Sequence, residues 1–361
     1  MVPAKLSAQP RVQAIIKFLY GNDQPDILFL GSSLILVASI AADATIDQTT
    51  PSSIADGLFE KLGKTDAIYA ARCVTEKAER PVHIKDLGIP AAMATDYGIL
   101  VDKLVAFKKH PHLLVIAIAP RDFCDNLYKD PNDTTSCEML AKCFPARGWL
   151  SPLTLLYYLS ENDFGFSEAI ENGINAGKIR AFTIRFYCER FLRDFVLTIL
   201  NKSTAVTLAS AQPKASEVAK KPSEQKSEVP SKRKYIDLDA YSFSYNPPDY
   251  GEFDRNFASL EATIKACRQQ KIPVALLNMP ISQENKALMP PYLYERYKSS
   301  LTRLHRDNGV VVIQPENMAS FGSDDFEDSA HLRCPGSQKL FRTISGDLAK
   351  MIKAPALSSS D

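Results

Sequence analysis

Three residues whose side chains can act together in nucleophilic catalysis lie near opposite ends of this 361-residue chain. Ser33 follows the apolar segment 27–30 in a Gly-Ser-Ser-Leu run. Asp328 and His331 stand three residues apart in a polar segment close to the other end. A serine attacks a carbonyl carbon when a histidine takes its proton and a carboxylate orients the imidazole. These residue types predict a nucleophilic triad, provided that the fold brings the two segments together.

Short apolar segments alternate with helical patterns along the chain. The expected strands are 27–30, 81–89, 113–118, 273–277 and 310–313. The expected core helices are 34–42, 92–109, 291–306 and 335–352, with 54–62 the best helical candidate between the first two strands. Short apolar strands separated by helices are typical of a parallel sheet that is covered on both faces. The pattern therefore predicts an α/β fold.

Polar or small residues follow the ends of these expected strands. Reactive groups in parallel α/β sheets gather beyond the carboxyl ends of the strands, where the strand order reverses. We therefore expect a single site at that edge of the sheet. The residues placed there are Ser33, Ala91, Arg121, Asn278 and the pair Asp328 and His331.

The chain is expected to divide into a core and several additions. The core comprises 26–122 and 255–352, and the additions are a lead-in helix in 1–25, a helical insertion or cap in 123–201, a linker in 202–234 and a flexible tail in 353–361. The linker is rich in Ser, Lys, Glu, Ala and Pro. Such a composition buries too little apolar surface to order itself, so we expect disorder there.

Composition excludes some classes of function and favours others. Forty-three basic and 42 acidic side chains nearly cancel, and no nucleic-acid-binding motif occurs, so we expect no nucleic-acid partner. The sequence shows no signal-peptide pattern and no apolar run long enough for a transmembrane helix, so we expect a cytoplasmic protein. Seven cysteines without a C-x-x-C spacing predict reduced thiols, with a disulfide among Cys124, Cys137 and Cys143 as the alternative.

A metal site near His331 is a second interpretation of the carboxylates in that segment. Asp324, Asp325 and Glu327 supply oxygen ligands close to the histidine. No second histidine has ligand spacing, which disfavours a catalytic divalent metal. We therefore expect neither a metal nor an organic cofactor.

Taken together, the serine run and the Asp-x-x-His segment resemble the SGNH/GDSL hydrolase superfamily. The first family signature corresponds to residues 31–34, with Ser33 as nucleophile, and the last to Asp328 and His331. The resemblance covers 26–122 and 255–352. It implies a flavodoxin-like three-layer α/β/α fold with a five-stranded parallel sheet. The loop 278–285 and the long insertion look similar to members that transfer D-alanyl groups or O-acetylate alginate.

The resemblance also implies an oxyanion hole, and the sequence departs from the family there. In the second signature, which spans 86–92 and includes Gly88, Ala91 stands where a donor glycine is expected. In the third signature, Arg121 replaces an asparagine. A guanidinium can donate to an oxyanion, bind an anionic substrate, or pair with Asp122 or Asp125. We place Ala91, Arg121, Gly88 and Asn278 as candidates for oxyanion or substrate binding.

The resulting prediction is a serine esterase or lipase that forms an acyl-enzyme on Ser33. The substrate would be a small-molecule, lipid or glycan ester. The same triad also suits an O-acyltransferase acting on a sugar or lipid hydroxyl, because only the second nucleophile differs. A non-catalytic binding module on the same scaffold is the alternative from another class. Peripheral contact with a membrane through the insertion is compatible with each of these functions.

Overall fold

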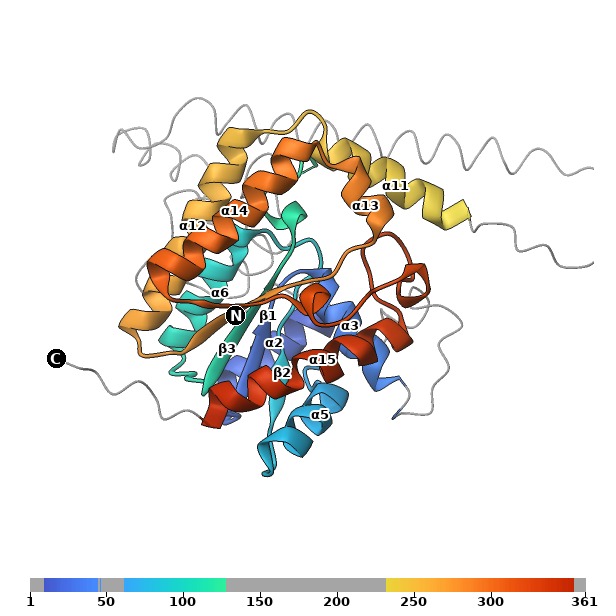
Figure 1. The fold of residues 1–361 in the computed structure, drawn as a ribbon. Coiled ribbons are helices and arrows are strands. Elements are labelled where there is room, and N and C mark those ends of the chain that lie inside the picture. Colours follow the sequence, from blue (N-terminus) through green and yellow to red (C-terminus); the bar gives the residue numbers. More distant parts are fainter. Residues whose placement is uncertain (1–9, 45, 47–61, 128–231, 354–361) are drawn as a thin grey trace, which may run out of the picture. The chain divides into compact units, whose positions relative to one another are not determined.

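Five parallel strands form the centre of the computed structural model, in the order β2-β1-β3-β4-β5 (Figure 1). The structure describes residues 10–44, 46, 62–127 and 232–353, which belong to one compact unit. The three middle strands have almost entirely buried side chains, which matches their continuous apolar sequences. The strands are β1 (Ile27–Leu30), β2 (Ile84–Asp86), β3 (Leu113–Ile118), β4 (Val274–Asn278) and β5 (Val311–Ile313).

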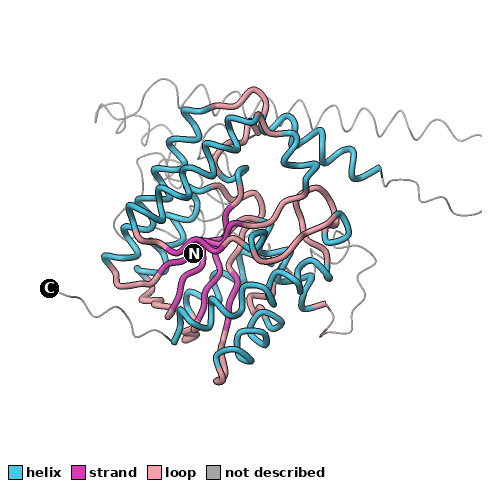
Figure 2. Tube along the Cα trace, viewed as in Figure 1, coloured by secondary structure: helices cyan, strands magenta, loops and turns pink. Residues whose placement is uncertain are grey.

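Helices cover both faces of this sheet, as Figures 1 and 2 show. Helices α3 (Ser33–Asp43), α5 (Ile68–Ala78) and α15 (Cys334–Lys353) pack against one another on one face. Helices α6 (Ala94–Ala106), α12 (Tyr250–Gln269) and α14 (Pro291–Asn308) form the layer on the other face. The expected three-layer α/β/α, flavodoxin-like fold is thereby confirmed for the described residues.

Shorter elements complete the described chain. Helix α13 (Gln283–Leu288) follows β4 and packs on α11 (Lys232–Tyr245). Single 3-10 turns are η1 (Pro120–Asp122), η3 (Pro315–Asn317) and η4 (Ser323–Asp325). Helix α2 (Pro10–Tyr20) precedes the sheet, and its Arg11 donates to the carbonyl oxygens of Asp86 and Gly88 just beyond β2. The lead-in helix is thus tied to the same sheet edge as the candidate site.

The strand order places the reversal of the sheet between β1 and β3. The chain runs from β1 to β2 on one side and then crosses to β3 on the other. Leu30 pairs with Ile116 at the end of β1, and Ile118 pairs with Asn278 at the ends of β3 and β4. A reversal between β1 and β3 is where doubly wound sheets of this order bind ligands. Ser33 and Arg121 follow these two strands.

The sequence-based boundaries differ from the structure mainly in irregular segments. The strand expected at 81–89 is limited to Ile84–Asp86, although the amides of Leu87 and Ile89 still donate to the carbonyl oxygens of Phe29 and Gly31 beyond it. The first-layer helix is Ile68–Ala78, whereas most of the expected helix at 54–62 lies outside the described residues. Helix α11 begins at Lys232, inside the expected linker. The expected insertion, apart from 123–127, and the tail from 354 onward also lie outside the described residues.

Candidate active site

Ser33 is the first residue of α3 and follows β1 through a tight connection. A Cβ atom at Gly31 would lie 2.9 Å from the carbonyl oxygen of Ala117 in β3, so only glycine allows the two backbones to approach this closely. Ser32 has an extended backbone and does not cap α3 with its side chain. The connection therefore leaves Ser33 at the positively polarised end of a helix, partly exposed at the sheet reversal.

Asp328 and His331 lie in the base loop, which we define as residues 323–333, comprising η4 and the segment that leads from it to α15. Phe326 and Leu332 form an antiparallel bridge across the loop, and the amide of Glu327 donates to the carbonyl oxygen of His331. The Asp328 carboxylate accepts hydrogen bonds from the backbone amides of Ala330 (2.9 Å) and His331 (2.6 Å). These contacts fold the four residues from Asp328 to His331 into a defined turn.

The structure brings the serine and the base loop together. His331 Nε2 lies 2.9 Å from Ser33 Oγ, and His331 Nδ1 lies 2.7 Å from Asp328 Oδ2. Both distances are within hydrogen-bond reach for a nucleophile, a base and an orienting carboxylate. The three side chains thus form a continuous serine–histidine–aspartate relay from segments 298 positions apart in the sequence.

The electrostatics of Asp328 suit the orienting role in such a relay. Burial alone would raise the pKa of this carboxyl. The facing His331 imidazole and the two backbone amides outweigh burial and hold the pKa of Asp328 below its usual range. The carboxylate is therefore ionised at neutral pH. An ionised partner at Nδ1 keeps a proton on that nitrogen and leaves Nε2 to accept the proton of Ser33.

The oxyanion side, which we define as Gly88, Ala91 and Arg121, is less regular. Gly88 already donates its amide to Asp86 Oδ1 at 2.6 Å, and its carbonyl oxygen accepts from Arg11. The Gly88 amide is therefore already hydrogen-bonded within the protein, so Gly88 does not fit the role of a donor to the oxyanion. Ala91 is partly exposed and has a φ of 59°, in the left-handed region that glycine favours. Its backbone therefore has the conformation of a glycine although the residue is alanine.

Arg121 is held by neighbours on its own side of the site. Its Nε donates to Asp125 Oδ2 at 2.6 Å, and its guanidinium carbon lies 5.6 Å from the centre of the Tyr241 ring. Asp125 is fully buried, whereas the Arg121 side chain keeps 21% of its surface exposed. Of the three roles that the sequence left open for Arg121, the structure contains the pairing with Asp125.

Asp122, the residue after Arg121, is linked to the connection that carries Ser33. It is buried and accepts hydrogen bonds from the Tyr97 hydroxyl, the Ala119 amide and the Ser32 hydroxyl. Burial raises the pKa of Asp122 to about 7, although these hydrogen bonds act in the opposite direction. The side chain therefore connects the end of β3 to the residue before the nucleophile.

Asn278, the remaining candidate, lies at the end of β4. Its Oδ1 accepts a hydrogen bond of 2.7 Å from the hydroxyl of Tyr297 in α14. The oxygen of the amide is thus oriented by the helical layer, and the side chain is partly exposed. This geometry anchors Asn278 at the same sheet edge as Ser33 and Arg121 without showing a contact with the triad.

Two carboxylates at the start of the base loop form ion pairs with cationic side chains. Asp325 pairs with Lys339 at 2.6 Å, and Asp324 pairs with Arg333 at 3.4 Å. Among the described residues, no group of three or more His, Cys, Asp or Glu side chains is arranged to hold a metal ion. Cys124 is a free, buried thiol, so the disulfide alternative involving it is wrong, while Cys137 and Cys143 lie outside the described residues.

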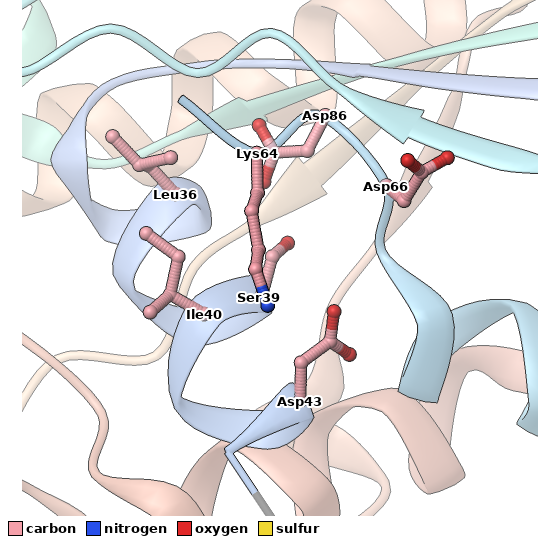
Figure 3. Close-up of a pocket in the computed structure, with 7 residues that line it drawn as sticks. All are labelled: Leu36, Ser39, Ile40, Asp43, Lys64, Asp66 and Asp86. Carbon is pink, nitrogen blue, oxygen red and sulfur yellow. The ribbon is translucent and has the colours of Figure 1, made fainter. Parts of the chain in front are cut away.

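A small cavity lies beside α3, away from its first residue. Its volume is about 10 Å³, which is room for one water molecule and not for an ester substrate. Figure 3 shows Ser39, Asp43 and Asp86 around this space, together with the other lining side chains Leu36, Ile40, Lys64 and Asp66. Within the described part of the chain, Ser39 Oγ and Asp86 Oδ2 have no hydrogen-bond partner. The cavity lies among side chains that pack between α3 and the end of β2, and it is too small to be a substrate pocket.

Several residues that shape the site were not singled out from the sequence. Tyr241 and Tyr245 stand four residues apart on α11, a spacing that places two rings on one helical face. Their rings stack with centroids 6.0 Å apart. Ser329 lies inside the Asp-x-x-His segment, and Asn285 is the third residue of α13, the helix that follows β4. The spacing of the two tyrosines could have marked α11 as part of the site, whereas Asn285 was named only as the last residue of the segment 278–285 and was given no role.

Among the described residues, no helix combines the length and apolarity needed to cross a membrane. Comparison with known proteins adds no functional assignment. No protein-family model matches the sequence, and no curated protein matches it. The fold and the geometry around Ser33 therefore carry the functional argument.

Proposed function

We propose that this protein is a serine hydrolase of the SGNH type, which cleaves an ester through an acyl-enzyme on Ser33. The observation that carries the proposal is the relay from Ser33 Oγ to His331 Nε2 and from His331 Nδ1 to Asp328 Oδ2, at 2.9 and 2.7 Å. A surface histidine that merely pairs with a nearby aspartate would not also face a serine at the connection that follows β1. The strand order supports the proposal, because the relay lies at the sheet reversal.

In the first half-reaction, the Ser33 hydroxyl attacks the ester carbonyl carbon and its proton passes to His331 Nε2. The tetrahedral intermediate carries the negative charge on the former carbonyl oxygen. His331 then donates the proton to the leaving alkoxide, which departs as an alcohol and leaves an ester on Ser33. Asp328 stabilises the imidazolium that exists between these two transfers.

The oxyanion needs hydrogen-bond donors that are already in place. The Ser33 amide lies at the N-terminus of α3, where the helix leaves its first amides without intrahelical partners. The Ala91 amide is the second candidate donor, since the Gly88 amide is committed to Asp86. Arg121 contributes positive charge near the end of β3 while its Nε stays bonded to Asp125.

In the second half-reaction, a nucleophile attacks the acyl group on Ser33 and regenerates the free serine. If the nucleophile is water, the protein is an esterase or lipase. If it is a sugar or lipid hydroxyl, the protein is an O-acyltransferase, and the proton again passes through His331. We propose hydrolysis as the basic activity, because it requires only the relay and water.

The direct test is covalent labelling of Ser33 with a fluorophosphonate probe, followed by mass-spectrometric identification of the labelled peptide. Wild-type protein should be labelled at Ser33 and should turn over short-chain p-nitrophenyl esters. Ser33→Ala and His331→Ala should each reduce turnover by about 10⁴-fold or more, while the folded structure is retained. Ser299→Ala, an exposed serine on α14, is the matched control and should behave as wild type.

The outcomes separate the alternatives. Wild-type protein that is neither labelled at Ser33 nor active on any ester would leave a binding module as the better description. Labelling and ester cleavage with acyl transfer to an added sugar or lipid hydroxyl, at the expense of free acid, would identify the acyltransferase. Labelling at another serine would overturn the assignment of the nucleophile.

A further inference from the structure

A buried polar chain connects helix α11 to the base loop. The Tyr245 hydroxyl donates to Asn285 Oδ1 at 3.0 Å, and Asn285 Nδ2 lies 3.1 Å from Ser329 Oγ. Asn285 and Ser329 are fully buried, and Tyr245 is nearly so. Buried hydrogen bonds of this kind fix geometry strongly, because breaking one leaves a polar group without a partner.

Ser329 is held through its backbone as well as through its side chain. The Ser282 amide, just before α13, donates to the Ser329 carbonyl oxygen at 3.0 Å. The Ser282 hydroxyl in turn accepts from the Asn285 amide at 3.2 Å and caps α13. The start of α13 therefore holds Ser329 through two hydrogen bonds, and Ser329 directly follows Asp328 in the sequence.

These contacts bear on the relay because Ser329 lies in the sequence between two of its three members, Asp328 and His331. Asp328 receives backbone hydrogen bonds from Ala330 and His331, which tie the two ends of the turn together. A rotation about Ser329 would move the Asp328 carboxylate and the imidazole relative to Ser33, which belongs to another element. Small displacements of catalytic groups reduce rates steeply.

The same chain reaches the oxyanion side through α11. Tyr245 stacks on Tyr241, and Tyr241 lies under the guanidinium of Arg121. On one face of α11, Tyr245 thus contacts Asn285, which holds the base loop, and Tyr241 contacts Arg121. This arrangement couples the packing of α11 to both sides of the site.

We infer that Asn285 is a positioning residue, which holds Ser329 against α13 and α11 and so sets His331 in register with Ser33. The inference rests on the proposed function for its catalytic consequence, although the hydrogen-bond geometry that it concerns can be measured separately. Asn285 acts through Ser329 and does not touch the reacting atoms.

The test uses the full chain and single substitutions at the two ends of the polar chain. Ser329→Ala removes the hydroxyl that faces Asn285, and Tyr245→Phe removes the hydroxyl on its other side while keeping the stacked ring. Ser345→Ala is the matched control, since Ser345 is an equally buried serine of α15 whose hydroxyl donates to the Arg342 carbonyl oxygen. Thermal unfolding of all variants measures any general loss of stability.

Two measurements report on positioning. The first is kcat and KM for p-nitrophenyl acetate, for which we expect kcat to fall about tenfold in Ser329→Ala and less in Tyr245→Phe, with KM unchanged. The second is the low-field proton NMR signal of His331 Nδ1–H, which reports its hydrogen bond to Asp328 without any turnover. We expect this signal to broaden or move upfield in both variants and to stay unchanged in Ser345→Ala.

Wild-type values of kcat and of the low-field signal in both variants would overturn the positioning role and leave the proposed function intact. An equal loss of kcat in Ser345→Ala would also overturn it, because the effect would then be a general one. A wild-type protein without esterase activity or labelling would refute the proposed function, and the NMR comparison would still decide whether Asn285 and Ser329 position His331.

Discussion

The base loop and the oxyanion side hold their charged groups in different ways. In the base loop, Asp328 takes its hydrogen bonds from its own turn, namely from Ala330 and from the backbone and ring of His331. On the oxyanion side, Arg121 is held by Asp125 and by Tyr241, a residue from a separate helix. The Asp328 carboxylate is thus held by its own turn, whereas the Arg121 guanidinium is held in part by a residue of another element.

The carboxylates of the two regions also differ in electrostatics. Asp328 is partly exposed, and its hydrogen bonds together with His331 lower its pKa in spite of burial. Asp122 is buried beside Arg121, and burial raises its pKa to about 7. Folding therefore favours the ionised form of Asp328 and disfavours the ionised form of Asp122. A substitution at Asp328 should therefore mainly lower the catalytic rate. Substitutions at Arg121 and Asp122 should mainly change the free energy of unfolding.

The largest expected effect is on the base loop. Asp328→Asn should reduce the rate of fluorophosphonate labelling of Ser33 and of ester turnover by about 10³- to 10⁴-fold, because a neutral amide favours the wrong imidazole tautomer. The amide oxygen can still accept from the Ala330 and His331 amides, so we expect the turn to stay folded, with only the modest loss of thermal stability that follows from removing an ionised group that folding favours. Asp324→Asn, whose carboxylate in the same loop is fully exposed, is the control. A loss smaller than tenfold would show that Asp328 is not the orienting group.

The second prediction concerns the Arg121–Asp125 pair. Arg121→Met should destabilise the protein by about 3 kcal/mol, because it leaves the buried Asp125 carboxylate without its cation. Adding Asp125→Asn should recover most of this loss, since the asparagine oxygen can still accept from the Leu127 amide. Chemical denaturation measures both effects.

Ester turnover by the Arg121→Met/Asp125→Asn protein sharpens the assignment. We expect kcat within about tenfold of wild type, because Arg121 Nε is engaged by Asp125. A recovered stability with kcat still lowered by 10²- to 10³-fold, the usual cost of losing an oxyanion donor, would instead make Arg121 a part of the oxyanion hole.

The difference between contacts within one segment and contacts between distant segments also explains which features could be predicted from the sequence. The strand at 113–118 matches β3 residue for residue, and the strand that precedes Ser33 is also correct, because both are short continuous apolar runs. The relay was predictable because each of its segments carries its residues at a fixed local spacing, and the parallel sheet brings the segments to one edge. The catalytic role of the relay stays a prediction.

The rest depends on contacts that no local pattern specifies. The partner of Arg121 is four residues away and was among the alternatives, yet Tyr241 comes from α11, whose first residues had been assigned to a linker. Gly88 is in a signature-like segment, but Asp86 and Arg11 take up its backbone groups. Asn285 gains its role only from burial against Ser329. Tertiary packing decides each of these cases.

The third prediction uses the opposite pKa shifts of the two carboxyls. A group whose pKa is raised by folding contributes stability below its unfolded value, and this contribution is lost as the pH rises through the folded value. Asp122, with a pKa of about 7 against its ordinary value of 3.8, should weaken folding progressively between about pH 4 and 7. Asp122→Asn should remove that dependence, so its stability relative to wild type should improve by roughly 2–4 kcal/mol over this interval.

Denaturant unfolding at several pH values checks this difference. Asp328→Asn is the comparison, because a lowered pKa gives stability that is present above the unfolded value and lost as the pH falls through the folded value. The stability difference between wild type and Asp328→Asn should therefore change with pH only at the acidic end. Parallel stability curves for wild type and Asp122→Asn from pH 4 to 8 would contradict the raised pKa of Asp122.

The smallest expected effect concerns the backbone at Ala91. With a φ of 59°, alanine is in a conformation that costs it about 1 kcal/mol and costs glycine almost nothing. Ala91→Gly should therefore raise the free energy of unfolding by up to about 1 kcal/mol, less what glycine adds to the entropy of the unfolded chain. Ala92→Gly, at a buried neighbour, should instead destabilise the protein by losing a packed methyl group.

If the Ala91 amide serves the oxyanion, Ala91→Gly keeps it, so kcat should stay within about twofold of wild type. A large fall in kcat with increased stability would mean that the alanine side chain holds this loop in its active geometry, and the oxyanion side would then depend on local packing as much as the base loop does.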